Sequence, residues 1–371
     1  MLLLITCRRI TQNDRLRPSP YHQSMSKSKS AIRKIASLSF PFATPEPFLF
    51  CVYHKDDYPA GNEKMEAPRV GNGMDFDPKA KWRMYHGDKI PGFPQHPHRG
   101  FETITATMTG LIDHTDSLKN GGRYGDGDLQ WMTAGKGIVH GEMFPLINKD
   151  KPNPLRFFQI WLNLPKKNKM VDPDYIMHWA EEVKKVTTED GKTSVTVWAG
   201  ELDGVKALPP PVNSWAADEK NDVAVWHIVL KPGAKWTIPA AKGGKSSNRS
   251  LYYIEGKSLH VEGKKIDPKT YMDVNAAMPI EVENPKGGSG IAELLMLQGK
   301  PIGEPVAQHG PFVMNTQGEI MQAFRDYQRT KFGGWPWDED AYVFPRTKGR
   351  FSKKGKKEEL PPGAKEESKK A

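Results

Sequence analysis

Two short stretches decide the fold and the chemistry of this chain. Residues 93–102 read FPQHPHRGFE, and residues 129–143 read LQWMTAGKGIVHGEM. The first contains His-x-His and the second contains His-x-Glu, so each presents two metal-ligating side chains two positions apart. Side chains alternate between the two faces of a β-strand, and the members of each pair therefore point to the same side. One metal ion can bind both members of a pair.

Together the two pairs predict a single metal site. His96, His98 and His140 offer neutral imidazole nitrogens, which first-row divalent metals favour, and a carboxylate would add a hard oxygen ligand. Glu142 and Glu102 are the two candidates for that carboxylate. If strand pairing brings the two stretches face to face, three histidines and one glutamate converge inside a barrel. Such a site leaves positions open for water, dioxygen or a substrate.

The sequence around these stretches predicts short β-strands. From residue 48 onward, short apolar segments are separated by Gly, Pro, Asp and Asn. Residues 156–163, RFFQIWLN, alternate between an apolar and a more mixed face, as a barrel strand would. A charged segment at residues 170–189 predicts the join between two domains, and strand-like runs resume after it. Two β-rich halves of similar size favour an all-β protein with a duplicated barrel.

One helix is expected near the C-terminus. Thr316 and Glu319 form a capping-box pattern, apolar residues follow at helical spacing, and Gly333 supplies a stop signal. This pattern predicts a short amphipathic helix after the second barrel.

The positive charge is concentrated at the two ends. The formal net charge is +10, of which residues 1–45 carry +7 and residues 346–371 carry +6, so the remainder is slightly acidic at −3. We therefore expect polar tails and no direct nucleic-acid binding by the folded core. The leader is rich in Arg, Lys and Ser, so a transit peptide is the alternative to an untargeted disordered segment.

Four segments follow from these patterns. We expect a disordered basic leader at residues 1–45 and a metal-binding barrel at 46–175. A barrel without metal, together with the helix, is expected at 176–333, because this half offers no second set of metal-ligating pairs. A disordered basic tail is expected at 334–371.

The cysteine count and the hydropathy pattern limit the class of protein and its cellular compartment. Cys7 and Cys51 are too few for a disulfide framework or a cysteine-based zinc site, which fits a reducing compartment. No run approaches the roughly 18 apolar residues that a membrane-spanning helix needs. We expect a monomer in the cytoplasm, the nucleus or both, with an organelle as the alternative if the leader is a transit peptide. Four other histidines are isolated in the sequence and are expected to be ordinary hydrogen-bonded residues: His114, His178, His227 and His309.

Three blocks of the sequence closely resemble the pirins, members of the cupin superfamily. The blocks are GFPQHPHRGFETIT, GDLQWMTAGKGIVHGEM and GEPVAQHGPFVMNTQGEI, and the likeness runs from about Pro47 to Gly333. The resemblance implies a bicupin, with two cupin-type β-barrels in one chain and a metal in the first barrel only. It also implies one mononuclear iron per chain, Fe(II) or Fe(III), with other divalent metals as alternatives. The implied ligand positions are His96, His98, His140 and Glu142.

The two glutamates have different expected roles. Many cupins take their carboxylate ligand from His-x-His-x3-Glu, which here is Glu102, whereas the pirin pattern uses the later Glu142. Glu102 is then expected beside the site, where it would orient an imidazole or serve as the alternative ligand. Either carboxylate is a candidate for the catalytic base.

Two functions follow from the resemblance, and the sequence leaves both open. The first is a quercetin (flavonol) dioxygenase, an oxidoreductase that opens an aromatic ring with dioxygen. The second is a non-catalytic iron-binding redox sensor, a transcriptional co-regulator that contacts transcription factors in the nucleus. An open, substrate-sized cavity at the metal would favour the enzyme. A closed site with a charged outer patch would favour the sensor.

Overall fold

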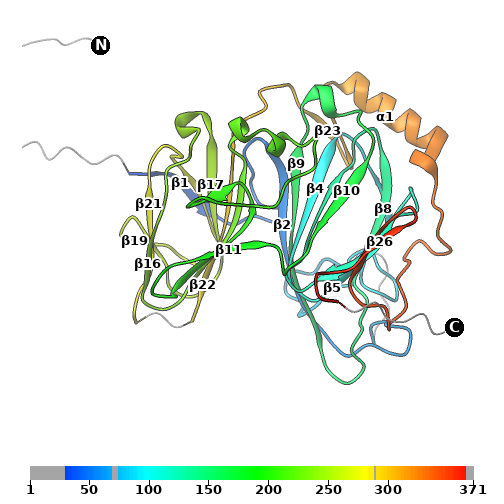
Figure 1. Ribbon diagram of the computed structural model, residues 1–371, viewed down its shortest axis with the longest axis horizontal. Coiled ribbons are helices and arrows are strands. Elements are labelled where there is room, and N and C mark those ends of the chain that lie inside the picture. Colours follow the sequence, from blue (N-terminus) through cyan, green and yellow to red (C-terminus); the bar gives the residue numbers. More distant parts are fainter. Residues whose placement is uncertain (1–29, 69–73, 288–289, 365–371) are drawn as a thin grey trace, which may run out of the picture. The chain divides into compact units, whose positions relative to one another are not determined.

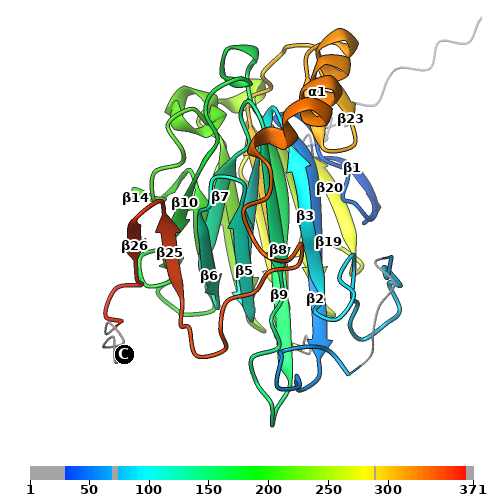
Figure 2. The ribbon, with the colours of Figure 1, turned by 90° about the vertical axis from the view of Figure 1, so that its right-hand side faces the viewer.

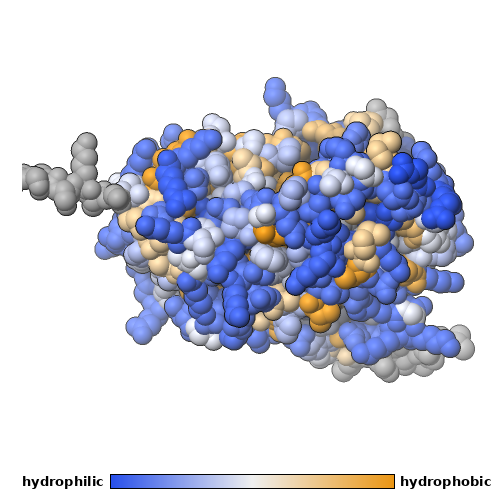
Figure 3. All heavy atoms as spheres, turned by 90° about the horizontal axis from the view of Figure 1, so that it is seen from above, coloured by the Kyte–Doolittle hydropathy of each residue, from blue (hydrophilic) through white to orange (hydrophobic). Residues whose placement is uncertain are grey.

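The computed structural model describes residues 30–68, 74–287 and 290–364. In this part of the chain nearly all regular structure is β, arranged in two barrels with one α-helix, as predicted (Figure 1). No helix among the described residues is long and apolar enough to cross a membrane. The molecular face seen in Figure 3 is largely hydrophilic, with its apolar residues in small separate patches.

The first barrel consists of two antiparallel sheets, with strand orders β10-β7-β4-β9-β2 and β26-β25-β6-β5-β8-β3. Its strands are β2 (Phe48–Tyr58), β3 (Gly92–His98), β4 (Phe101–Thr109), β5 (Leu111–Asp116), β6 (Gly121–Gly125), β7 (Leu129–Thr133), β8 (Ile138–Met143), β9 (Asn153–Asn163), β10 (Asp174–His178), β25 (Phe351–Lys354) and β26 (Lys357–Glu359). The predicted domain join at residues 175/176 therefore falls inside β10, which pairs with β7 of this barrel.

The second barrel consists of a seven-stranded sheet, β1-β20-β17-β22-β15-β12-β11, and a four-stranded sheet, β16-β21-β18-β19. Its strands are β1 (Ile32–Ser37), β11 (Lys184–Thr187), β12 (Thr193–Ala199), β15 (Ala224–Leu230), β16 (Ala234–Ile238), β17 (Asn248–Glu255), β18 (His260–Val261), β19 (Lys264–Lys265), β20 (Thr270–Val274), β21 (Ile280–Asn284) and β22 (Ala292–Gly299). Apolar side chains such as Ile228, Leu251, Met272 and Leu294 fill its interior.

Short elements connect the barrels and cover their ends. Two small hairpins pair β13 (Glu201–Leu202) with β14 (Val205–Lys206), and β23 (Ala307–His309) with β24 (Phe312–Met314). Five 3-10 turns complete the regular structure of the described residues: η1 (Lys166–Asn168), η2 (Trp215–Ala217), η3 (Glu219–Asn221), η4 (Gly244–Ser246) and η5 (Lys331–Gly333).

A shared apolar layer joins the two barrels. Ile104 of β4 and Ile160 of β9 belong to the same buried cluster as Tyr252 of β17 and Leu295 of β22. Alternate residues of β4 therefore face opposite ways, with Ile104 toward the second barrel and Thr105 toward the interior of the first. This alternation decides which glutamate can reach the metal site.

The helix α1 (Gln317–Thr330) has the predicted start but an earlier end. The Thr316 hydroxyl accepts a hydrogen bond from the backbone N–H of Glu319 at 3.2 Å, and the Glu319 carboxylate accepts one from the backbone N–H of Thr316 at 2.9 Å. Ile320 and Ala323 are buried in a cluster with β23 and β24. The helix stops before the predicted Gly333, because Lys331 already adopts a left-handed conformation with φ of 49°.

Both predicted tails contribute ordered strands, so the prediction of disorder is wrong for their described residues. β1 pairs with β20 at an edge of the second barrel, and Phe42 packs against Tyr252 with ring centroids 5.2 Å apart. β25 pairs with β6, extending the first barrel at the edge seen in Figure 2, and Phe351 is 2% exposed. A few apolar residues within each charged run suffice to dock it. Residues 1–29 and 365–371 lie outside the described part.

Candidate metal centre

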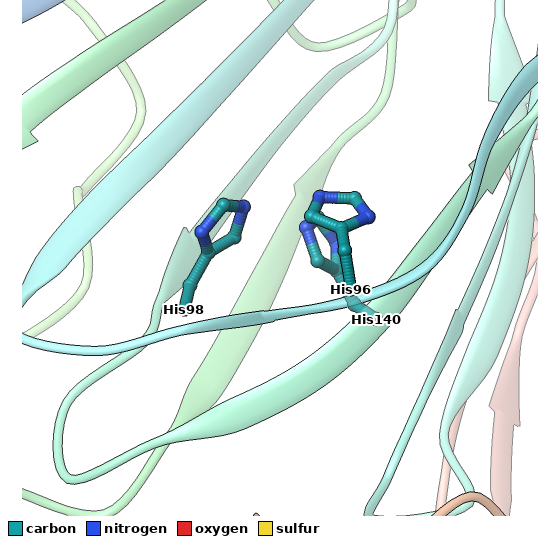
Figure 4. Close-up of side chains that lie close together, drawn as sticks. All are labelled: His96, His98 and His140. Atoms are coloured by element: carbon teal, nitrogen blue, oxygen red, sulfur yellow. The ribbon is translucent and has the colours of Figure 1, made fainter. Parts of the chain in front are cut away.

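Strands β3 and β8 bring three histidines together. The strands pair antiparallel, with His96 directly opposite His140. His98 lies two residues beyond His96 on the same face, as the period of a strand requires. One nitrogen from each ring lies within 4.8 Å of one from each of the others. Figure 4 shows the three imidazoles gathered on one side of the two strands.

Two glycines shape the turn that leads into β8. Gly135 has a φ of +49°, and a Cβ at this position would lie 2.1 Å from the carbonyl oxygen of Val171. Gly137 has a φ of +134°, and a Cβ there would lie 2.7 Å from the ring of Phe332. Only glycine fits both positions without strain. The TAGKG stretch therefore sets the position of His140 through backbone geometry.

The hydrogen bonds of the imidazoles leave lone pairs for a metal. Nδ1 of His96 lies 2.9 Å from the carbonyl oxygen of Pro94. A carbonyl only accepts, so Nδ1 carries the proton and Nε2 keeps its lone pair. Among the described residues, Nδ1 of His98 and both ring nitrogens of His140 are buried without a hydrogen-bond partner. Buried polar atoms normally have partners, so these nitrogens fit a site that binds a metal ion.

Burial also sets the charge state of the site. It lowers the pKa of His96 to about 4 and the pKa values of His98 and His140 well below the usual range, because a charged ring loses its hydration. The three imidazoles are therefore neutral near pH 7, which is the form that binds metals. The donor set and its protonation fit a first-row divalent metal.

Glu142 lies beside the histidines but outside their close group. Its Oε1 accepts hydrogen bonds from the hydroxyls of Thr105 at 3.0 Å and Tyr124 at 3.3 Å. Its Oε2 accepts one from Nε2 of Gln159 at 2.7 Å. Burial raises the pKa of this carboxyl group. Glu142 lines the same cavity as His96, so its predicted role as the fourth ligand stays a prediction that this position permits.

Glu102 lies away from the site, which corrects its predicted place beside the histidines. It occupies the face of β4 that points toward the second barrel, and its carboxylate accepts hydrogen bonds from Thr133 at 2.7 Å and Ser214 at 2.5 Å. Burial raises its pKa to about 7. The spacing to His98 matched the cupin pattern, but the turn at Gly100, with a φ of +85°, separates β3 from β4 and their faces. Glu102 therefore orients none of the three imidazoles here.

His114 is a site neighbour that the sequence analysis missed. It lies opposite Glu142 in the pairing of β5 with β8, and its ring centroid is 5.6 Å from that of His140. Neither ring nitrogen has a hydrogen-bond partner among the described residues, and Nε2 is 3.5 Å from Oδ2 of Asp116. The expectation of an ordinary hydrogen-bonded residue is thus wrong for His114. The sequence pattern His114-x-Asp116 could have indicated this, because it places a histidine and a carboxylate on the same face of one strand.

The other isolated histidines lie elsewhere. His178 bonds the carbonyl oxygen of Pro209 at 3.0 Å, and His227 bonds Glu293 at 2.8 Å, as expected of ordinary polar residues. The ring of His309 packs edge-on against Phe324.

A cavity of about 680 Å³ opens beside the histidines. His96, His98 and Glu142 line one part of it. Its remaining wall is rich in aromatic side chains, including Phe50, Phe76, Phe93, Phe157 and Trp161. Its volume lies within the range of about 300–1,000 Å³ typical of small-molecule sites. The arrangement can hold a metal ion and a planar aromatic ligand side by side.

Comparison with known proteins places these features in a family. Residues 46–162 match the Pirin domain family, and residues 225–333 match the Pirin C-terminal cupin domain. A pirin-like protein of Caulobacter vibrioides is 37% identical over 261 residues, covering 69% of this chain and 88% of that protein. Pirin of Homo sapiens is 36% identical over 265 residues, covering 70% and 83%. A crystal structure of quercetin 2,3-dioxygenase from Acinetobacter baumannii aligns with a TM-score of 0.62 and 28% identity, covering 78% and 87%.

Proposed function

This chain belongs to the pirin family, and from that premise we propose that it is a metal-dependent dioxygenase that opens the ring of a flavonol such as quercetin. The observation that carries the proposal is the cavity of about 680 Å³, which places an aromatic wall next to three neutral histidines. The structural likeness to a quercetin 2,3-dioxygenase supports the choice of substrate. The open cavity also favours catalysis over the sensor alternative.

The metal we propose is iron, one ion per chain. His96, His98 and His140 would hold it through neutral nitrogens, with Glu142 as the fourth ligand. When bound, such an ion supplies Lewis-acid polarisation of the substrate's oxygens and a site for dioxygen chemistry. Because Glu142 is not in the close group of nitrogens, ligation would require its carboxylate to move toward the histidines, and Oε2, which accepts a single hydrogen bond, keeps a lone pair for the metal.

The chain's own residues bind the substrate and accept its proton. Phe93, Phe157 and Trp161 offer faces and edges on which flat rings can pack, and they exclude water from the reacting region. Glu142 is the carboxylate of this cavity, so the base role predicted for a glutamate also falls to it rather than to Glu102. Its raised pKa makes it a stronger proton acceptor than an exposed glutamate.

Four details expected from the sequence remain predictions. They comprise iron as the natural metal, transcription-factor partners, a monomeric state and a nuclear, cytoplasmic or organellar location.

The proposal is tested by metal analysis combined with a turnover assay. Protein purified from its natural source is analysed for bound metals, and metal-free protein is reconstituted with Fe(II), Ni(II) or Zn(II). Loss of quercetin absorbance is followed together with oxygen uptake, with His96→Ala/His98→Ala as the matched control. The proposal predicts equimolar quercetin and oxygen consumption by the iron-loaded wild type and none by the control. Iron-loaded protein that consumes neither substrate would contradict it.

A further inference from the structure

A buried chain of hydrogen bonds ends at the cavity wall opposite the histidines. His54 lies on β2 directly across from Phe157 on β9, and the two rings stack with centroids 4.4 Å apart and planes at 17°. His54 is only 4% exposed, and it lines the cavity. Its Nδ1 lies 2.7 Å from the hydroxyl oxygen of Tyr85. The imidazole is therefore held in place by the hydrogen bond to Tyr85 and by stacking on Phe157.

The number of protons available along this series of hydrogen bonds determines the tautomer of His54. Oδ1 of Asp56 accepts hydrogen bonds from the backbone N–H of Arg83 at 3.0 Å and from its Nε at 2.9 Å. Oδ2 of Asp56 accepts the hydroxyl proton of Tyr85 at 2.7 Å. A phenol has one proton to donate, so the Tyr85 oxygen can only accept from His54. Nδ1 of His54 therefore carries the proton, and Nε2 carries the lone pair.

The lone pair on Nε2 has no partner within the described part of the chain. Protonation does not resolve this, because burial and the nearby Arg83 charge lower the pKa of His54 to about 3. The ring is thus a neutral hydrogen-bond acceptor at physiological pH. Unlike the ring nitrogens of His140, Nε2 of His54 is not fully buried, and His54 lines the cavity, so this nitrogen is accessible to a donor that enters the cavity.

We infer that Nε2 of His54 accepts a hydrogen bond from a hydroxyl group of the cavity's ligand, which makes His54 a specificity-determining residue for hydroxylated aromatic compounds. The inference rests on the proposed function and refines its substrate class. Tyr85 and Asp56 act as positioning residues, since they touch His54 and hold its acceptor nitrogen in the required tautomer.

The geometry also indicates which hydroxyl is recognised. The ring of Phe93 contacts both His54 and His96 edge-on, with centroid distances of 5.9 Å and 6.4 Å, and no direct contact joins the two histidine rings. A flavonol that presents the oxygens of its central ring to the histidine cluster has its outer-ring hydroxyls elsewhere in the cavity. We therefore assign the contact with His54 to an outer-ring hydroxyl, away from the reacting centre.

Binding measurements separate recognition from a merely structural role. Zinc-loaded protein, kept anaerobic so that no turnover occurs, is titrated with quercetin and with its 5,7,3′,4′-tetramethyl ether, which keeps the 3-hydroxyl but has methoxy groups in place of the outer-ring donors. Wild type should favour quercetin by about tenfold or more, as expected for one buried acceptor left unpaired. His54→Leu should bind both compounds within about twofold of each other. His309→Leu, outside the cavity, is the matched control and should keep the preference.

Nitrogen NMR provides a readout that does not depend on flavonols. In ¹⁵N-histidine-labelled protein, His54 should show the Nδ1–H tautomer, and Tyr85→Phe should release the other tautomer. Catechol, a small hydroxylated aromatic, should shift the Nε2 resonance of the wild type. A preference for quercetin that survives in His54→Leu overturns the inference and leaves the proposed function standing. If wild type binds no quercetin, the proposed function fails, and the catechol response alone then decides the inference, which an unmoved Nε2 signal overturns.

Discussion

The buried carboxyl group of Glu102 should impose a measurable pH dependence on stability. Burial raises its pKa from an ordinary 4.5 to about 7, because the charged form loses its hydration between the barrels. The folded state therefore holds this proton more tightly than the unfolded state does. The resulting stabilisation is fully present below about pH 4.5 and is lost as the pH rises through about 7. At 1.36 kcal/mol per tenfold change in proton affinity, the loss is about 3 kcal/mol.

Replacing Glu102 with Gln isolates this contribution. The amide never ionises, so the variant lacks this source of pH dependence while keeping the size of the side chain. Urea unfolding of both proteins is measured at pH 5, 6, 7 and 8 at constant salt. The free energy of unfolding of wild type minus that of Glu102→Gln should fall by about 2.5 kcal/mol from pH 5 to pH 8, because a small part of the loss lies below pH 5.

The control is Glu189→Gln, which makes the same replacement at an exposed position. A wild-type minus Glu102→Gln difference that stays constant across this pH range would refute the reasoning. Metal content supplies an independent check, because Glu102 faces Thr133 and Ser214 rather than the histidines. Glu102→Gln should therefore bind metal as wild type does.

Three further predictions concern the site, the tail and the helix. Glu142→Gln should lower iron affinity by about 10- to 100-fold in an anaerobic titration, because an anionic oxygen is lost; unchanged affinity would mean that Glu142 is no ligand. Deleting residues 350–371 removes the buried Phe351 and should lower the free energy of unfolding by at least about 2 kcal/mol in urea, and no loss would argue against docking of β25. Thr316→Ala removes the helix cap and should lower the free energy of unfolding, measured by thermal denaturation, by about 1 kcal/mol, whereas Thr316→Ser should leave it nearly unchanged. Equal losses in the two variants would count against the capping box.

The parts of the fold predicted from sequence are those that depend on local periodicity. His96 and His98 share a face because strand residues alternate, and the same rule applies to His140 and Glu142 on β8. The capping box at Thr316 is likewise a local pattern, and it forms as expected. Family resemblance supplied the pairing of the two strands, which spacing alone does not determine.

The parts that were not predicted depend on tertiary contacts. Glu102 has the expected spacing from His98, but one face of β4 packs against the second barrel, and alternation turns Glu102 toward Ser214 on that face. His114 reaches the site only because β5 pairs with β8. The docking of Phe351 depends on an unpaired edge at β6, which the charge of the tail does not reveal.

The histidines of β3 and β8 are proposed to form a single metal centre. This proposal is tested most directly by loading the full chain with excess Fe(II) under anaerobic conditions, removing free metal and measuring the iron-to-protein ratio. We expect about one iron per chain for the wild type and close to none for His96→Ala/His98→Ala, whose fold should be intact by circular dichroism. Equal iron in both proteins, or none in the wild type, would contradict it.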